Sequence, residues 1–460
     1  MNLRPISLGL RSNPARSGYA GAARLINCFA EEVGEEGIAP WNVLGCSGFD
    51  NFSTLTDGGA VRAMLALDDA KAYVVSGRGV YRVDAGGSST LLGGFPTAGF
   101  CTMARNRKAV PEVAIVSDGL VYQIVADVLT QVSDPDLPPA TSVAGLNGYF
   151  VFQLTDGRMF SSGLDEIDVG ALDFAAASSD PDNAMRVYAR GQDLLSFGTR
   201  SLEFWQDAGA ETFPFSRVTS RQIGMLASSS VADIDQTCAW VAHDGTVRML
   251  QGYDGVRIST HAVERSIKND PSPADITACS WQELGHSFYA LSGTDWTWVY
   301  DATTRLWHER ESYGEGRWRI GQALRFAGWT VLGDYELGKL YTLDDETYTE
   351  AGAHLVTKIV TPPVTNGGQK FRLDRVELDM ETGIGLASAL AHEANPQVML
   401  DYTRDGVNYS AQRMMSAGRM EQSMAKVFAT RLGQHDSVSL RFSISAPVRR
   451  RIIGTRVGVS

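Results

Sequence analysis

Cysteine is scarce in this sequence, and no two cysteines form a recognisable pair. The five residues, Cys28, Cys46, Cys101, Cys238 and Cys279, are scattered over 460 positions, and none shares a C-x-x-C spacing with another. This arrangement excludes the common zinc and redox-dithiol motifs and argues against a disulfide framework. The sequence therefore predicts a protein that folds in a reducing cytosol.

Long hydrophobic runs are also missing. The opening stretch, MNLRPISLGLRSNPARSGYAG, interrupts each apolar run with Arg, Pro, Asn or Gly, so it does not resemble a secretory signal. No run of about 18 apolar residues occurs anywhere, and we therefore expect no membrane span.

Positive charge is in short supply. The chain carries 41 Lys plus Arg against 53 Asp plus Glu, a net charge of -12. This balance argues against a general nucleic-acid binder, which needs a basic surface. The deficit is uneven: residues 371–460 hold 12 basic and 9 acidic residues, whereas the rest holds 29 and 44. Such asymmetry indicates that the two ends of the molecule face different neighbours.

Catalytic motifs are absent as well. The sequence has no G-x-S-x-G elbow, no P-loop and no H-E-x-x-H, and its seven histidines lack metal-ligand spacing. We therefore predict no catalytic residue, no metal ligand and no cofactor. Four acidic clusters lie in turn-like stretches: Asp68-Asp69, Asp134/Asp136, Asp180/Asp182 and Asp344-Asp345-Glu346. We interpret them as turn chemistry, with a divalent cation or a glycosidase carboxylate pair as the alternatives.

What the sequence does have is glycine and a recurring pattern. A short apolar strand, a Gly-containing turn and a second strand with an aromatic residue recur at intervals of 36 to 49 residues. The instances begin at Lys71, Glu112, Gly148, Gln192, Thr237, His286 and Trp329. A four-stranded propeller blade needs roughly 40–50 residues, so the spacing predicts a β-propeller of six or seven blades.

The pattern divides the chain into four parts. We expect an extended N-terminal segment over residues 1–54, which completes the propeller, and the propeller itself over 55–350. Pro362-Pro363 and Gly367-Gly368 predict a linker over 351–370. Residues 371–460 predict a small C-terminal β-sandwich, so the fold class is all-β. Within this domain, residues 411–430 fit either a helix or strands broken at Gly418, and we favour strands.

One basic run stands out near the C-terminus. Arg449, Arg450 and Arg451 lead into an apolar strand, and alternation places Arg449 and Arg451 on one face. The run is either a contact for an acidic partner or for passing phosphate, or a charged edge that blocks unwanted strand pairing.

These segments together resemble a known family. RLINCFAEE (24–32), VRAMLALDDAKAYVVSGRGVYRVDA (61–85), HSFYALSGTDWTWVYDATTRLWHER (286–310), LGDYELGKLYTLD (332–344) and NPQVMLDYTRDGVNYS (395–410) are the most telling stretches. In order and spacing they are similar to the packaged-DNA stabilisation proteins of short-tailed phages, also called tail hub or nozzle proteins.

The resemblance implies a structural virion protein without enzymatic activity. It implies a homohexameric ring below the portal and its adaptor, which closes the head, retains the DNA and extends the ejection channel. Partners implied are the adaptor, tailspikes or fibres and a needle or plug, with assembly in the host cytoplasm. DNA would pass without specific binding, which suits an acidic lumen. The alternatives are a propeller that binds or degrades glycans and a cellular scaffold propeller that binds peptides.

Overall fold

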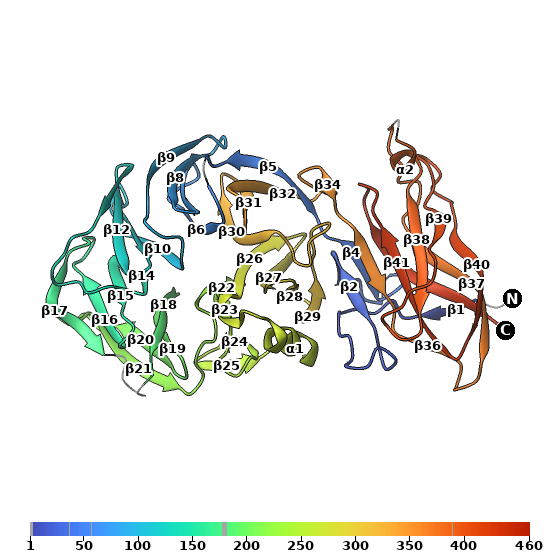
Figure 1. Ribbon diagram of the computed structural model, residues 1–460, viewed down its shortest axis with the longest axis horizontal. Helices are drawn as coiled ribbons and strands as arrows, with labels where there is room; N and C mark the ends of the chain where they lie inside the picture. The colour runs from blue at the N-terminus through green and yellow to red at the C-terminus, as the bar shows by residue number, and fades with distance from the viewer. Residues whose placement is uncertain (1–2, 36, 57, 177–181, 389) are drawn as a thin grey trace.

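The structure is a computed structural model that describes residues 3–35, 37–56, 58–176, 182–388 and 390–460. It consists of a β-propeller and a β-sandwich that lie side by side (Figure 1). The all-β prediction, with a propeller followed by a C-terminal sandwich, is confirmed.

The propeller has seven blades in the described residues, each with four antiparallel strands, and the sheets of the last two blades continue into further strands. The first four blades run in simple chain order. They are β6 (Val61–Ala66), β7 (Lys71–Ser76), β8 (Gly79–Asp84), β9 (Ser89–Gly94); β10 (Cys101–Arg105), β11 (Val113–Ser117), β12 (Leu120–Val125), β13 (Val128–Gln131); β14 (Ser142–Leu146), β15 (Tyr149–Gln153), β16 (Arg158–Ser162), β17 (Val169–Ala176); and β18 (Ala184–Arg190), β19 (Asp193–Gly198), β20 (Leu202–Asp207), β21 (Phe215–Arg221).

Blades five to seven contain the remaining propeller strands. These are β22 (Ala232–Ile234), β23 (Thr237–Val241), β24 (Val247–Gln251), β25 (Asp254–Arg257); β26 (Thr277–Glu283), β27 (His286–Ser292), β28 (Thr297–Asp301), β29 (Leu306–Glu309); and β30 (Ile320–Phe326), β31 (Trp329–Asp334), β32 (Lys339–Asp344) with β5 (Gly48–Thr54). Helix α1 (His261–Asn269) and the short turns η1 (Ser228–Ser230) and η2 (Pro273–Asp275) join blades four, five and six.

The repeated sequence pattern corresponds to the second and third strands of each blade. Both faces of these strands are buried because each blade packs between two others; in β7, for example, every residue after Lys71 is buried. The Asp-Gly pair between β11 and β12 forms a hairpin turn: Asp118 and Gly119 both have positive φ, 49° and 84°, as a type I′ turn requires.

Apolar cores between neighbouring blades close the ring. One core joins Tyr73 and Val75 of blade one to Ile115 and Tyr122 of blade two, and equivalent cores follow around the molecule. The last core joins Leu340 of blade seven to residues of blade one. In blade seven the fourth strand is β5, which pairs antiparallel with β32. The N-terminal segment thus supplies the strand that joins the two ends of the ring.

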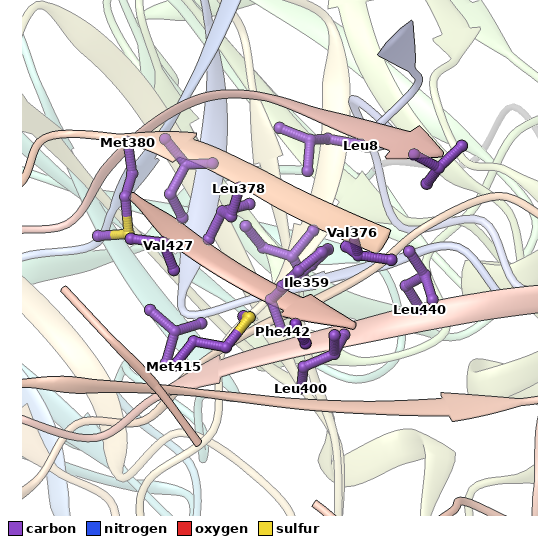
Figure 2. Packing of buried hydrophobic residues seen from close by; sticks show 14 of the residues in the cluster. Leu8, Ile359, Val376, Leu378, Met380, Leu400, Met415, Val427, Leu440 and Phe442 are labelled. Carbon is purple, nitrogen blue, oxygen red and sulfur yellow. The ribbon is translucent and has the colours of Figure 1, made fainter. Parts of the chain in front are cut away.

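The sandwich is built from two sheets. The first contains β1 (Leu3–Ile6), β3 (Cys28–Glu32), β4 (Trp41–Gly45), β37 (Phe371–Met380), β40 (Val427–His435) and β42 (Arg451–Val459), and the second contains β2 (Arg24–Ile26), β35 (Thr357–Val360), β36 (Val364–Thr365), β38 (Gln397–Thr403), β39 (Arg413–Ser416) and β41 (Ser437–Ile444). Their inner faces bury residues such as Val376, Leu400 and Phe442, as Figure 2 shows. Helix α2 (Ala391–Ala394) lies beyond one end of the sheets (Figure 1).

Two expectations about the domain boundaries need correction. Residues 351–370 are not a free linker, because they contain β34 (Ala353–His354), β35 and β36, and β35 pairs with both β2 and β41. The prolines interrupt the chain only after β35 has ended at Val360. The N-terminal segment does more than complete the propeller, because β1 to β4 belong to the sandwich sheets. Residues 411–430 form strands β39 and the start of β40 on either side of an irregular stretch at Gly418.

Candidate functional site

The basic run at residues 449–451 lies where the chain enters β42. The exposed side chains of Arg449 and Arg451 both reach Glu381, with nitrogen–oxygen distances of 3.3 and 3.4 Å. They therefore lie on the same side of the strand, as the alternation predicts. Half of each side chain remains exposed, so both stay accessible to a partner.

Arg450 does not fit the expected external contact, because it is buried. Its guanidinium donates to the carbonyl oxygens of Tyr348 at 3.2 Å and Ala446 at 3.0 Å, and to Thr357 Oγ1 at 3.3 Å. Burial lowers the pKa of Arg450 to about 10. Tyr348 follows the last propeller strand and Thr357 begins β35, so Arg450 connects the two domains from inside.

Backbone hydrogen bonds between strands run without interruption across the joint between the domains. Strand β2 pairs in parallel with β29 of blade six and antiparallel with β35 of the sandwich. A single sheet therefore runs from the propeller into the sandwich. Arg24 forms a bidentate salt bridge with Glu309 across this contact, through Nη2 and Oε2 and through Nε and Oε1, which lie 3.0 Å apart.

Asn27 occupies the centre of this joint. It adopts φ of 55°, which Asn tolerates better than most residues, and it is buried. Its Nδ2 donates to the carbonyl oxygens of Glu311 and Val356, both at 2.9 Å, and its Oδ1 accepts from the Glu311 amide at 3.0 Å. Glu311 belongs to the propeller and Val356 precedes β35, so one side chain holds both domains.

A second buried cluster lies next to the joint. His286 Nδ1 lies 2.8 Å from Asp301 Oδ2, and this contact raises the pKa of the imidazole despite burial. The ring of Phe29, from the N-terminal segment, packs edge-on against His286 at 4.9 Å. Burial lowers the pKa of the neighbouring His308 to about 3, so that side chain stays neutral.

The acidic clusters act as turn residues. Asp68 Oδ1 accepts from the amides of Ala70 and Lys71, both at 2.8 Å, and Asp344 Oδ1 accepts from the Glu346 amide at 3.1 Å. Asp134 Oδ1 accepts from the Asp136 amide in the same way. Asp182 instead accepts from the amides of Arg200 and Ser201, in the turn between β19 and β20, and Asp180 lies outside the described residues. Within the described part of the chain, no group of three or more His, Cys, Asp or Glu is arranged to hold a metal ion.

Sequence reasoning missed the joint and the histidine cluster. Asn27 lies within RLINCFAEE, but nothing local distinguishes it from any other Asn before a strand. The groups that bind its side chain are about 300 residues away in the chain. In the described residues, no helix is long and apolar enough to cross a membrane.

Comparison with solved structures returns other propellers. The WD40 propeller domain of Doa1 matches with 12% identity and a TM-score of 0.42, covering 65% of this chain and 96% of that one. The propeller domain of Myceliophteria thermophila Swd1 matches with 11% identity and a TM-score of 0.45, covering 64% and 100%. A search of curated proteins found no match.

Comparison with family models assigns both domains. Residues 39–348 match the model described as the β-propeller of bacteriophage P22 Gp10, and residues 357–460 match the model described as its β-sandwich. The two matches follow the order of the two domains in the structure and together span most of the chain. This chain therefore belongs to the bacteriophage P22 Gp10 family, whose members are structural, DNA-stabilising proteins of the phage tail.

Proposed function

We propose that the protein is the tail hub of a short-tailed phage. It forms a homohexameric ring beneath the portal and adaptor proteins, closes the head after packaging and retains the DNA. The ring extends the channel for DNA ejection, seats tailspikes or fibres, and is stoppered by a needle or plug protein. Assembly takes place in the host cytoplasm.

The match of both domains to one phage family is the observation that carries this proposal. The charge distribution supports it, because residues outside 371–460 hold 44 acidic against 29 basic side chains. A channel with such a surface repels phosphate, so DNA slides through it without binding. A ring of identical subunits needs head-to-tail contacts between two different surfaces, and the oppositely charged propeller and sandwich offer such a pair.

The joint between the domains also supports a role that requires a rigid molecule. The sheet shared by β29, β2 and β35, together with Asn27 and Arg450, restrains rotation of the sandwich against the propeller. A hub that holds packaged DNA under pressure needs a fixed arrangement of its two contact surfaces.

The decisive experiment measures DNA retention in heads assembled without this protein. We would delete its gene from the parent phage, purify the heads and measure nuclease-protected genome per capsid. The expected result is heads that package DNA and then lose it, with retention and infectivity restored by adding the purified chain. Heads that remain full and stable without it would contradict the proposal.

A matched variant makes the rescue specific. Asn27→Ala leaves every surface residue in place but removes the side chain that links the domains. Protein with this change should restore retention less well than the wild type, whereas the exposed change Arg78→Gln should restore it fully.

A further inference from the structure

A cavity of about 640 Å³ lies at the inner strands of blades two, three and four. Residues of β10, β14 and β18 form its walls, with Leu65 of blade one at its border. Its size is within the range of sites that hold small ligands. None of the functional residues discussed above lines it.

The charge of this cavity is opposite to that of the protein as a whole. Of the described residues that line it, four are basic, namely Arg105, Arg107, Lys108 and Arg186, and none is acidic. Only Lys108 has a carboxylate partner, Glu112 at 2.7 Å. A chain with a net charge of -12 therefore gathers four basic side chains around one cavity.

The other three side chains bind neutral oxygen atoms. Arg107 Nη2 donates to Asn147 Oδ1 at 3.0 Å, Arg186 Nη1 donates to the Ser228 carbonyl at 2.7 Å, and Arg105 Nη1 donates to the Leu67 carbonyl. These contacts position the guanidinium groups, but they do not offset the charge.

Within the part of the chain that the structure describes, Arg186 lacks a full set of hydrogen-bond partners. Its Nε is buried and has no hydrogen-bond partner among the described residues. Ser228 takes Nη1, so the edge of the guanidinium formed by Nε and Nη2 has no hydrogen-bond partner among the described residues. This is the edge that pairs with both oxygens of a carboxylate or phosphate. The rings of Phe100 and Tyr188 lie 5.4 and 5.3 Å from the guanidinium carbon and hold the group in place.

The nearby Asp233 carboxylate attracts Arg186 but forms its ion pair with Arg190, at 3.4 Å, and accepts a hydrogen bond from Tyr188. Burial has the largest influence on Arg186 and lowers its pKa, although Asp233 acts in the opposite direction. A bound anion would offset that cost.

We propose that this cavity binds an oxyanion, the carboxylate or phosphate group of a small ligand, through the free edge of Arg186, with Arg105 and Arg107 adding positive charge at the walls. The site is independent of the tail-hub role, since it uses neither the domain joint nor the basic run before β42.

The test measures anion binding to the purified full chain by calorimetry at constant ionic strength. Inorganic pyrophosphate represents the phosphate source and citrate the carboxylate source. We expect saturable binding of at least one probe, and Arg186→Gln should weaken it by about tenfold or more, as loss of a charged hydrogen-bonding pair does. The matched control is Arg78→Gln, an exposed arginine in the β7–β8 turn, which should bind as the wild type does.

A second variant keeps the test decisive if Arg186→Gln does not fold. Arg105 is exposed at the cavity wall, so Arg105→Gln should preserve the fold and weaken binding by severalfold. Binding of pyrophosphate alone assigns a phosphate ligand, and binding of citrate alone assigns a carboxylate ligand. If neither probe binds the wild type, or if both arginine variants bind as tightly as the wild type, the proposal is wrong.

Discussion

The propeller and the sandwich are both all-β, yet they are assembled in opposite ways. Each of the first six propeller blades takes its four strands from one continuous stretch, such as residues 61–94 for blade one. The sandwich instead joins the two ends of the chain, and β1 pairs with β42 so that Leu3 lies opposite Gly458. Strands that pair with their neighbours in the chain leave a repeated pattern in the sequence, whereas strands that pair with distant parts of the chain do not.

The N-terminal segment is where the two modes of assembly meet. Strands β1 to β4 belong to the sandwich sheets, and β5 completes blade seven. Neither domain is therefore built entirely from its own part of the sequence, and the stability of each depends on the same 54 residues.

Deletion of residues 1–54 should abolish folding of both domains. The propeller loses the strand that closes its ring at Leu340–Ser53, and the sandwich loses β3 and β4 beside β42. We expect insoluble protein or no cooperative thermal transition by circular dichroism. Deletion of residues 1–6 alone, which removes only the edge strand β1, should leave a cooperative transition. If the protein lacking residues 1–54 melts in a cooperative transition like that of the full chain, the domains fold independently of the N-terminal segment.

Asn27→Ala should uncouple the domains. The change removes three side-chain hydrogen bonds and leaves a less tolerant residue at φ of 55°. The expected loss in the free energy of unfolding is about 3 kcal/mol. Asn27→Gly removes the same hydrogen bonds but accepts the backbone angle, so it should be less destabilising by about 1 kcal/mol.

Tryptophan fluorescence separates the two domains in this experiment. Eight of the nine tryptophans lie between residues 205 and 329, in the propeller, and the ninth, Trp41, lies in β4. Denaturant unfolding followed by fluorescence reports mainly on the propeller, whereas far-ultraviolet dichroism reports on both domains. We expect the two curves to coincide in the wild type and to diverge in Asn27→Ala. Coincident curves in the variant would argue against Asn27 as the link.

His308 should make the propeller sensitive to acid. Its pKa is held at about 3 in the folded protein, whereas an unfolded chain takes up a proton near pH 6.5. The free energy of unfolding therefore falls as the pH drops below about 6.5, by about 2 kcal/mol at pH 5. His286 acts in the opposite direction, because its raised pKa adds stability below the unfolded value that is lost as pH rises through the folded value.

His308→Phe tests this assignment. The ring would sit among Phe29 and Phe288, and the fall in stability between pH 7 and pH 5 should shrink relative to the wild type. His392→Gln, at an exposed position in α2, is the control and should leave the pH profile unchanged. If His308→Phe keeps the wild-type profile, acid sensitivity arises elsewhere, for example at the buried His435 of the sandwich, whose pKa is lowered by burial.

Glu381→Gln should have the smallest effect on stability. It breaks the ion pairs with Arg449 and Arg451, which are half exposed. Exposed pairs contribute little, so the free energy of unfolding should change by no more than about 0.5 kcal/mol. A larger loss, measured by denaturant unfolding, would mean that the basic run is a structural element rather than an accessible surface.

The sequence was most informative where structure is local. The seven predicted repeats begin at or within one residue of β7, β11, β15, β19, β23, β27 and β31. It was least informative at residues 351–370, where Pro and Gly suggested a linker. There β35 is held by β2 and β41, strands that lie more than 80 residues away on one side and more than 300 on the other.

The three residues of the basic run also differ in how far local sequence predicts their positions. Alternation along a strand is a local property, and it correctly placed Arg449 and Arg451 together beside Glu381. Burial of Arg450 is not local, because it depends on Tyr348 and Thr357, about a hundred residues away. No pattern in residues 445–455 distinguishes the buried arginine from the exposed ones.

The blades, the hairpin turns, the acidic charge and the phage family could be inferred from the sequence, because each rests on neighbouring residues or on composition. The sharing of the N-terminal segment, the joining of the domains by Asn27 and Arg450, and the position of Arg186 at a cavity lined by no carboxylate among the described residues emerge only from the folded structure. These features depend on groups that folding brings together from distant parts of the chain, and their hydrogen bonds and charges acquire partners, or lack them, only in the packed molecule.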